Sequence, residues 1–413
     1  YTTTDTLSLH DALPICMAPF KLIEVKDKQS ENIWLSFPSL LYKGDPNYVR
    51  PFDEDVKKLF DPAKNKLLRK GGDAIRWLLY DEQQQLVGRI AAFIDPNTAK
   101  NNDQPTGGCG FFDCINVQEA ANQLFDASKQ WLLERGMEAM DGSVNFGDRD
   151  NFWGVLVEGF TEPVFNMPYN FPYYKTLFEN YGFKNYFNQL TFERAVNSEG
   201  LADKVFEKAA RVKANPDYTF EMIAWNRKEK YAKDFMTIYN KAWGVIPGVK
   251  LITEAHAMAL LKQLEQILDR RLAHFGYYQG EPIAFFIMMQ DLNQVIKDFN
   301  GKLTTVNKIK LMLRLKVLRR CDRIIGRIFG IVPEHQGKGV DGALILHFRE
   351  IALKKNFPYK ELQMNWIGDF NEPMIKVVKG ISAKICKVHV TYRLLFDPAK
   401  PFQRAKRQKK ELE

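Results

Sequence analysis

Residues 331–340 read Ile-Val-Pro-Glu-His-Gln-Gly-Lys-Gly-Val, and the fold prediction rests chiefly on them. An apolar run at 324–332 predicts a strand before it, and helical spacing of apolar residues predicts a helix at 340–355 after it. Glycines let a ligand approach the backbone, and the first N–H groups of a helix are unpaired and favour negative charge. The stretch therefore predicts an anion site. The alternative is an ordinary turn with a solvated Lys338.

The same succession of elements occurs twice along the chain. Each half runs strand, helix, hairpin, strand, helix, strand, helical turn, strand. In the C-terminal half, we expect strands at 220–225, 272–277, 282–288, 324–332, 362–367 and 383–393, and helices at 231–243, 254–268 and 340–355. In the N-terminal half, we expect strands at 20–25, 75–80, 86–94, 110–115 and 137–144, and helices at 30–42 and 118–135.

This repetition predicts an α/β (α+β) protein with two domains of one architecture. Each domain is expected to hold a mixed, mostly antiparallel twisted sheet flanked by helices. We place the N-terminal domain at 17–198, the C-terminal domain at 199–397 and a basic tail at 398–413. Residues 1–16 resemble translated sequencing-adapter sequence, lack the features of a secretory signal and are expected to be an artefactual leader before Met17.

The composition excludes several classes of protein. The 413 residues carry 59 Lys and Arg against 50 Asp and Glu, and 45% are hydrophobic, so the chain can bury a core and is not disordered. No apolar run approaches the roughly 20 residues that span a membrane. The cysteines after the leader are too few for a disulfide framework and indicate core positions in a cytoplasmic protein: Cys109, Cys114, Cys321 and Cys386. No metal-ligand spacing occurs.

The glycine turn in this context resembles the phosphate-binding turn of the GNAT (GCN5-related) N-acetyltransferase superfamily, which reads Gln/Arg-x-x-Gly-x-Gly/Ala. Gln336 and Gly339 match, whereas Asp341 replaces the last small residue and Gly342 follows it. Residues 361–374 resemble the family's next strand and the Asn that begins a helix beside the cofactor. The resemblance covers nearly all of 17–397. Over this length the chain is similar to a bacterial group of long tandem GNAT-like proteins of unassigned substrate.

The resemblance implies acetyl-CoA or another acyl-CoA as co-substrate, with its pyrophosphate on the backbone of the turn. The cofactor-binding residues it implies are Ile331, Val332, Gln336, Gly337, Lys338, Gly339, Val340, Gly342 and Asn371. The N-terminal half resembles the family more faintly, and residues 115–118 hold no glycine, so no second cofactor site is expected there. On this reading Gly339→Glu should abolish CoA binding and leave the fold intact.

The expected reaction is acyl transfer to an amine, with the N-terminal half shaping the acceptor pocket. Such transfer needs an amine that loses its proton and an oxyanion donor, which is expected to be a backbone N–H near Val332. In many family members a Tyr at the position equivalent to 378 serves as general acid to the leaving thiolate. Here that position holds Val378, so no general acid is assigned. The general base is left unassigned, with a water relay as an option, after weighing Glu254, Tyr277, Tyr278, Glu334, His335, His389 and Tyr392.

Two segments carry the excess positive charge. Nine basic residues lie in 302–327 against Asp322 alone, and six lie in 400–410 with no acid. Lys308 to Val317 alternates like a strand, but its composition favours a helix. The segment is either a solvated capping helix or a surface for membrane phosphates, nucleic acid or CoA phosphates. Two alternatives to the enzyme therefore stay open: a non-catalytic GNAT-like binding protein, and a transferase that docks tRNA or other nucleic acid. Oligomeric state is not predicted.

Overall fold

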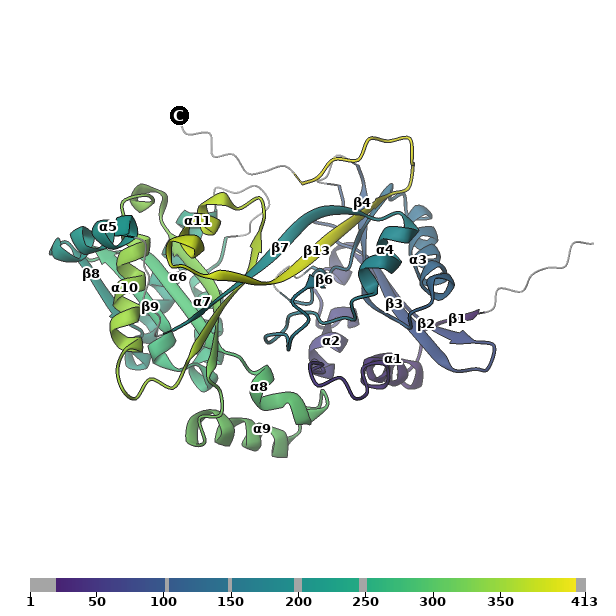
Figure 1. Ribbon diagram of the computed structural model, residues 1–413, viewed down its shortest axis with the longest axis horizontal. Helices are drawn as coiled ribbons and strands as arrows, with labels where there is room; N and C mark the ends of the chain where they lie inside the picture. Colours follow the sequence, from purple (N-terminus) through teal and green to yellow (C-terminus); the bar gives the residue numbers. More distant parts are fainter. Residues whose placement is uncertain (1–19, 101–103, 148–150, 197–202, 245–250, 406–413) are drawn as a thin grey trace, which may run out of the picture.

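The computed structural model describes residues 20–100, 104–147, 151–196, 203–244 and 251–405. The leader, the junction near residue 200 and the end of the tail lie outside them. In the described residues 13 strands form one continuous sheet, in the order β1-β2-β3-β4-β5-β13-β7-β12-β11-β10-β9-β8, with β6 paired to β13. The mixed, mostly antiparallel sheet confirms the predicted fold class. It runs unbroken from one half to the other (Figure 1).

The N-terminal half follows the predicted succession. Its elements are β1 (Phe20–Glu24), α1 (Lys28–Leu41), α2 (Asp53–Phe60), β2 (Asp73–Asp81), β3 (Leu86–Ile94), β4 (Thr106–Cys114), α3 (Gln118–Leu133), β5 (Ala139–Gly142), β6 (Val155–Glu158) and α4 (Tyr174–Tyr181). Helix α1 begins at a capping box, because Asp27 accepts from the backbone N–H of Ser30 at 2.7 Å and the Ser30 hydroxyl accepts from that of Asp27.

The C-terminal half repeats the pattern around a second set of helices. Its elements are α5 (Asp203–Ala214), β8 (Tyr218–Met222), α6 (Lys228–Trp243), α7 (Glu254–Ile267), β9 (Ala273–Tyr278), β10 (Glu281–Gln290), α8 (Asn293–Ile296), α9 (Thr305–Met312), β11 (Arg323–Ile331), α10 (Val340–Ala352), β12 (Glu361–Gly368) and α11 (Glu372–Gly380). Lys308–Val317 is helical, because α9 continues as a π-helical turn over Leu313–Val317. Helix α5 lies in a stretch for which the sequence pattern predicts no element.

The two halves exchange strands through β7 (Lys184–Ala195) and β13 (Lys384–Leu395), which form a long two-stranded ribbon between them (Figure 1). β13 comes last in the chain yet pairs with β5 of the N-terminal half, whereas β7 comes from the first half and pairs with β12 of the second. A domain boundary near residue 198 stays a prediction. β7 precedes that boundary in the chain, yet in the sheet it lies between two strands of the second half, β13 and β12.

Helices cover both faces of the C-terminal part of the sheet. On one face Phe285 of β10 stacks on Phe235 and Trp243 of α6. On the other face Phe286 packs edge-on against Phe348 of α10. Alternate residues of one strand therefore belong to two layers, as the two-residue period of a strand requires. Cys109, Cys114 and Cys321 are buried, as predicted, and Cys386 is half-buried.

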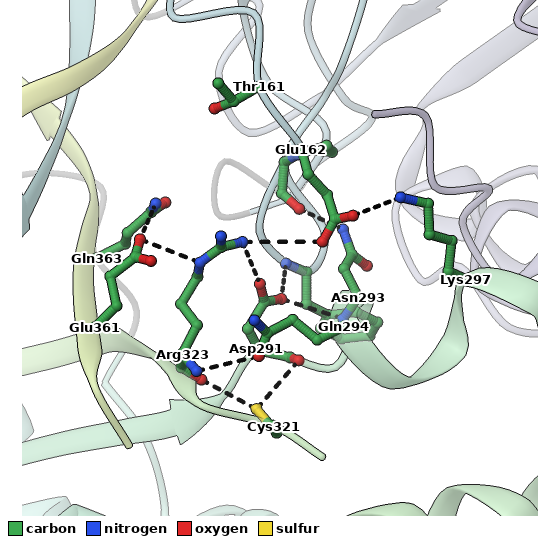
Figure 2. Close-up of polar contacts among 12 residues, drawn as sticks. Thr161, Glu162, Asp291, Asn293, Gln294, Lys297, Cys321, Arg323, Glu361 and Gln363 are labelled. Carbon is green, nitrogen blue, oxygen red and sulfur yellow. Dashed lines mark hydrogen bonds and ion pairs between the residues drawn. The ribbon is translucent and has the colours of Figure 1, made fainter. Parts of the chain in front are cut away.

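A buried polar network joins the halves on the α6 face of the sheet. Asp291, which follows β10, is fully buried and accepts from the Arg323 guanidinium at 3.2 Å and from the backbone N–H of Phe165 at 2.9 Å. Figure 2 shows this carboxylate between the β11 arginine and the loop that carries Glu162. Asn293 donates to the carbonyl of Pro163 at 2.8 Å. The loop before α4 is thus tied to the second half by hydrogen bonds and charges.

Two buried histidines and Asp291 couple stability to pH. Desolvation lowers the pKa of His389 to about 4 and that of His274 to about 3. The folded state therefore excludes protons that the unfolded histidines take up below about pH 6.5, and stability is lost as pH falls below that value. Desolvation raises the pKa of Asp291 to about 6. The folded protein therefore takes up a proton at Asp291 between pH 6 and 3.8, and this uptake stabilises the fold as the pH falls. The stability lost through the two histidines exceeds the stability gained through the one carboxyl.

We therefore expect the free energy of unfolding to fall between pH 6.5 and 4, and His389→Gln to make that fall less steep. The steepest slope of the wild-type unfolding free energy is about 1.4 kcal/mol per pH unit, which corresponds to a net uptake of one proton on unfolding. Denaturant unfolding measured across this range checks it, with His256→Gln as the control because His256 is exposed. An unchanged slope in His389→Gln would contradict a neutral, buried imidazole.

Candidate functional site

A gap opens in the sheet where two parallel strands separate. Residues Arg323–Gly326 of β11 pair with Glu361–Met364 of β12. Beyond Gly326 and Met364 the pairing ends, although β11 runs on to Ile331 and β12 to Gly368. Each strand keeps its other neighbour, since Ile331 pairs with Ala284 and Ile367 with Leu190. The unpaired edges of β11 and β12 therefore face one another beside the glycine turn.

The turn at the end of β11 presents the backbone of α10. A 3₁₀ turn (Pro333–His335) follows the strand, and the side chain of Gln336 donates back to the carbonyl of Ile331 at 2.9 Å. Gly337 and Gly339 have φ of +75° and +94°, in the region that favours glycine. Gly339 is the N-cap of α10 and supplies no side-chain cap. The first N–H groups of α10 have no partner within the helix.

The other residues predicted around the turn play different parts. Val340 and Gly342 are buried in the first turn of α10, and Lys338 is exposed. Asp341 is half-buried beside them, at a helix end where the dipole favours a carboxylate. The N–H of Val332 donates to the carbonyl of Ile283 at 2.9 Å, so this group does not serve as the oxyanion donor.

Helix α11 begins after Asn371, as predicted, and lies on the far side of the gap. Asn371 is its N-cap, and its side-chain oxygen accepts from the backbone N–H of Met374 at 3.2 Å. Val378 is fully buried in the core of the C-terminal half, so the position where the resemblance leads one to expect a Tyr holds an apolar packing residue. Asn371 thus sets the start of the helix, and α11 offers no acid at Val378.

The sheet carries a pocket on one face and a cleft on the other. An apolar pocket of about 40 Å³ lies between α10 and α11 and is lined by Phe329, Met364 and Val377 among others. On the α6 face a cleft of about 1060 Å³ lies between the two halves. Trp366 lines this cleft only two residues along β12 from Met364. One strand at the gap therefore contributes to both cavities.

Aromatic and basic side chains line much of the cleft, together with polar and aliphatic residues. Its aromatic lining comes from both halves and from the exchanged strands: Phe93, Phe146, Trp153, Tyr186, Phe187, Tyr239, Trp366 and Phe370. Lys58, Lys64 and Lys66 line the N-terminal side. Asp141 and Arg393 face each other across two hydrogen bonds of 2.6 and 2.8 Å, with the guanidinium over the Tyr186 ring. The cleft suits a ligand with a large apolar part.

The titratable residues weighed from sequence lie apart from this cleft. His335 contacts the Tyr218 hydroxyl at 3.2 Å and the Tyr278 ring, and Tyr277 donates to Asp234 at 2.7 Å. His389 is fully buried and donates to the carbonyl of Pro168 at 3.2 Å, and Tyr392 donates to Glu179 at 2.9 Å. Glu254 and Glu334 are exposed. Sequence reasoning missed His256, an imidazole of the first turn of α7 that lines the cleft.

The N-terminal half has the same strand arrangement without the turn. β4 and β5 are parallel over three positions, Thr106–Gly108 against Ala139–Asp141. Helix α3 then begins after Val117, with no side-chain cap and no glycine. Beside it, buried Asp113 binds Arg89 at 2.7 Å and accepts from the Tyr42 hydroxyl at 3.0 Å. Internal partners thus occupy the Asp113 carboxylate.

Comparisons with known proteins agree with this architecture. No family model matches the chain. The protein YghO of Escherichia coli (strain K12) is 28% identical over 385 residues, 89% of this chain and 93% of the relative. A bacterial ceramide synthase of Caulobacter vibrioides (strain NA1000 / CB15N) is 25% identical over 386 residues, 91% of this chain and 97% of the relative.

Two solved structures share the fold over 92% of this chain, each with 11% identity and a TM-score of 0.51. One is a tandem GNAT protein from the clavulanic acid biosynthesis pathway, matched over 100% of its length. The other is a GCN5-related glucosamine N-acetyltransferase region in a fungal multi-domain β-N-acetylglucosaminidase, of which the match spans 38%. The chain therefore has the tandem fold of the GCN5-related N-acetyltransferases.

Proposed function

We propose that the protein is an N-acyltransferase that moves an acyl group from acyl-CoA to an amine. The observation that carries the proposal is the gap between β11 and β12. It begins where the pairing ends and runs toward the glycine turn, and β12 lines both the pocket next to α10 and the cleft between the halves. A donor held at the turn and extended along the gap would bring its thioester to an acceptor in the cleft.

The turn is the proposed site of the pyrophosphate. Helix N-terminal N–H groups bind anions, and the positive φ of Gly337 and Gly339 turns the backbone without side chains in the way. Ile331, Val332, Gln336 and Lys338 would flank the donor, together with Val340, Gly342 and Asn371. CoA would supply the activated thioester. The chain's own part is to hold its phosphates and align the carbonyl.

The acceptor that fits the cleft is an amine with a long apolar chain. The cleft is large and lined by aromatic rings, which suit an amphiphile better than a small sugar. The relative from Caulobacter is called a ceramide synthase, and a ceramide is the amide of a fatty acid with a long-chain amino alcohol. We therefore propose a fatty acyl-CoA donor and a long-chain amine acceptor for this chain.

In the proposed reaction the amine nitrogen attacks the thioester carbonyl, loses a proton and forms an amide, and the CoA thiolate leaves. The amine must be neutral when it attacks. His256 faces the cleft and is our candidate for receiving that proton, directly or through water. The thiolate takes its proton from solvent, because α11 presents Val378 instead of an acid.

The test is an assay with palmitoyl-CoA and a long-chain amino alcohol. We expect amide by mass spectrometry and one free thiol for each amide. Glucosamine serves as the small-amine comparison and is expected to react poorly. Calorimetry with palmitoyl-CoA and acetyl-CoA accompanies the assay. Absence of binding at millimolar ligand would overturn the enzyme and leave a non-catalytic GNAT-like protein, whereas binding without transfer to either amine would overturn the acceptor class.

Trp366→Ala is expected to raise the KM for the long-chain amine about tenfold, since it removes one large apolar contact. The affinity for acyl-CoA should hold, because the side chain of Trp366 lies on the cleft face. Steady-state kinetics with varied amine and calorimetry with acyl-CoA check both parts. Leu353→Ala, at an exposed leucine after α10, is the control. An unchanged KM would place the acceptor outside the cleft.

A further inference from the structure

Helix α9 and its π-helical continuation expose a row of aliphatic side chains. Val306, Ile309, Leu313 and Val317 are spaced three, four and four residues apart, so they share one face of the helix. They are 60%, 64%, 46% and 68% exposed. We call this row, together with Leu303 and Leu318, the α9 stripe. Both leucines are exposed as well. The helix lies at the outer edge of the molecule, beyond α8 (Figure 1).

A different face of the same helix holds it to the protein. Leu311 and Leu315 are buried and belong to the core of the C-terminal half. Arg314 forms an ion pair with Asp298 and donates to the carbonyl of Val295 at 2.6 Å. The α9 stripe is therefore not needed to fix the helix, and its apolar surface is left in water. A continuous apolar row of this kind marks an interaction surface.

Exposed positive charge surrounds the stripe. Six basic side chains of this segment are exposed: Lys302, Lys308, Lys310, Lys316, Arg319 and Arg320. The sequence contains no acid between Asp298 and Asp322. The surface thus combines aliphatic side chains with an excess of positive charge. This is the composition of helices that lie in the interface of an anionic membrane.

We propose that the α9 stripe docks the protein on an anionic phospholipid surface. The aliphatic side chains would enter the boundary between head groups and acyl chains, and the six cations would lie among the phosphates. A second copy of this chain fits less well, because a symmetric contact would place like charges opposite one another. Nucleic acid would use the cations and leave the aliphatic row in water. No helix within the described ranges is long and apolar enough to cross a membrane.

The experiment is co-sedimentation of the full chain with vesicles. Vesicles of phosphatidylcholine with about one-third phosphatidylglycerol are compared with pure phosphatidylcholine, at low salt and at 0.5 M NaCl, a concentration that screens surface charge. We expect at least tenfold stronger binding to the anionic vesicles, weakened by salt. The readout is binding and not catalysis, so it is independent of the proposed acyl transfer.

The variants separate the stripe from general charge effects. Ile309→Glu with Val317→Glu should weaken anionic-vesicle binding at least tenfold. The matched control is Leu40→Glu with Leu353→Glu, which adds the same charge at leucines 60% and 51% exposed on α1 and after α10. Failure of the wild type to bind, equal binding to both vesicle types, or equal loss in the control would overturn the proposal. So would sedimentation velocity showing a dimer that the stripe variant dissolves, or stronger binding to RNA than to vesicles.

Discussion

Gly337→Asp is expected to weaken acyl-CoA binding at least 100-fold and to leave the fold intact. Gly337 is exposed, and a Cβ added there would meet no heavy atom within 4 Å. The new carboxylate would stand at the turn proposed for the pyrophosphate. Two like charges about 4–5 Å apart near a protein surface repel by about 3–4 kcal/mol, and about 2.7 kcal/mol is 100-fold in affinity. Calorimetry with acyl-CoA measures the loss.

Gly280→Asp is the matched control for this prediction. Gly280 lies in the β9–β10 hairpin with φ +85°, and an added Cβ there also meets nothing within 4 Å. Both variants therefore carry the same backbone strain and the same charge. Their melting temperatures should fall alike, and Gly280→Asp should bind acyl-CoA as the wild type does. Equal affinity in the two variants would place the phosphates elsewhere.

The choice of Gly337 corrects an expectation from sequence. Gly339→Glu was expected to spare the fold, but a Cβ on Gly339 would stand 2.9–3.1 Å from Cβ and backbone atoms of Lys208 in α5. That substitution would push α5 from α10 as well as enter the turn. Sequence alone could not show this, because α5 lies in a polar stretch and its contact with α10 is a long-range one.

Local signals predicted the elements, and long-range pairing determined how they meet. The glycine turn, the hairpins and the start of α11 at Asn371 rest on residues close in sequence, so their patterns were informative. The exchange of β7 and β13 was not visible, since strand pairing across two hundred residues leaves no local mark. The alternation at Lys308–Val317 resembled a strand because α9 has apolar residues on two faces, Leu311 and Leu315 inward and the α9 stripe outward.

The candidate site was predicted on the donor side only. A phosphate turn is a continuous segment with its own spacing, and Gln336 to Gly339 could be recognised from it. The cleft is assembled from Phe93, Tyr239, Trp366 and other residues that are distant in sequence, and an exposed His256 on a helix carries no signal of its own. The roles of the candidate bases near the turn could not be predicted from sequence for the same reason. Their neighbours are set by tertiary packing.

Arg323→Met is expected to destabilise the protein by about 3 kcal/mol at pH 7.5, because it leaves the buried carboxylate of Asp291 without its cation. Asp291 would keep the backbone N–H groups of Phe165 and Asn293, at 2.9 and 3.1 Å, but these do not neutralise it. The variant should also loosen the loop at Glu162, which the same guanidinium faces at 4.0 Å (Figure 2). Denaturant unfolding gives the size of the effect.

A pH series and a surface pair make the reason for this loss testable. Desolvation already raises the pKa of Asp291 to about 6, and removal of Arg323 should raise it further. Below pH 6 the carboxyl is increasingly protonated in both proteins, so the difference in unfolding free energy should shrink by pH 5. Arg135→Met breaks the exposed pair with Asp73 and should cost under about 1 kcal/mol with no such trend. A pH-independent loss in Arg323→Met would assign the effect to packing of the arginine and not to its charge.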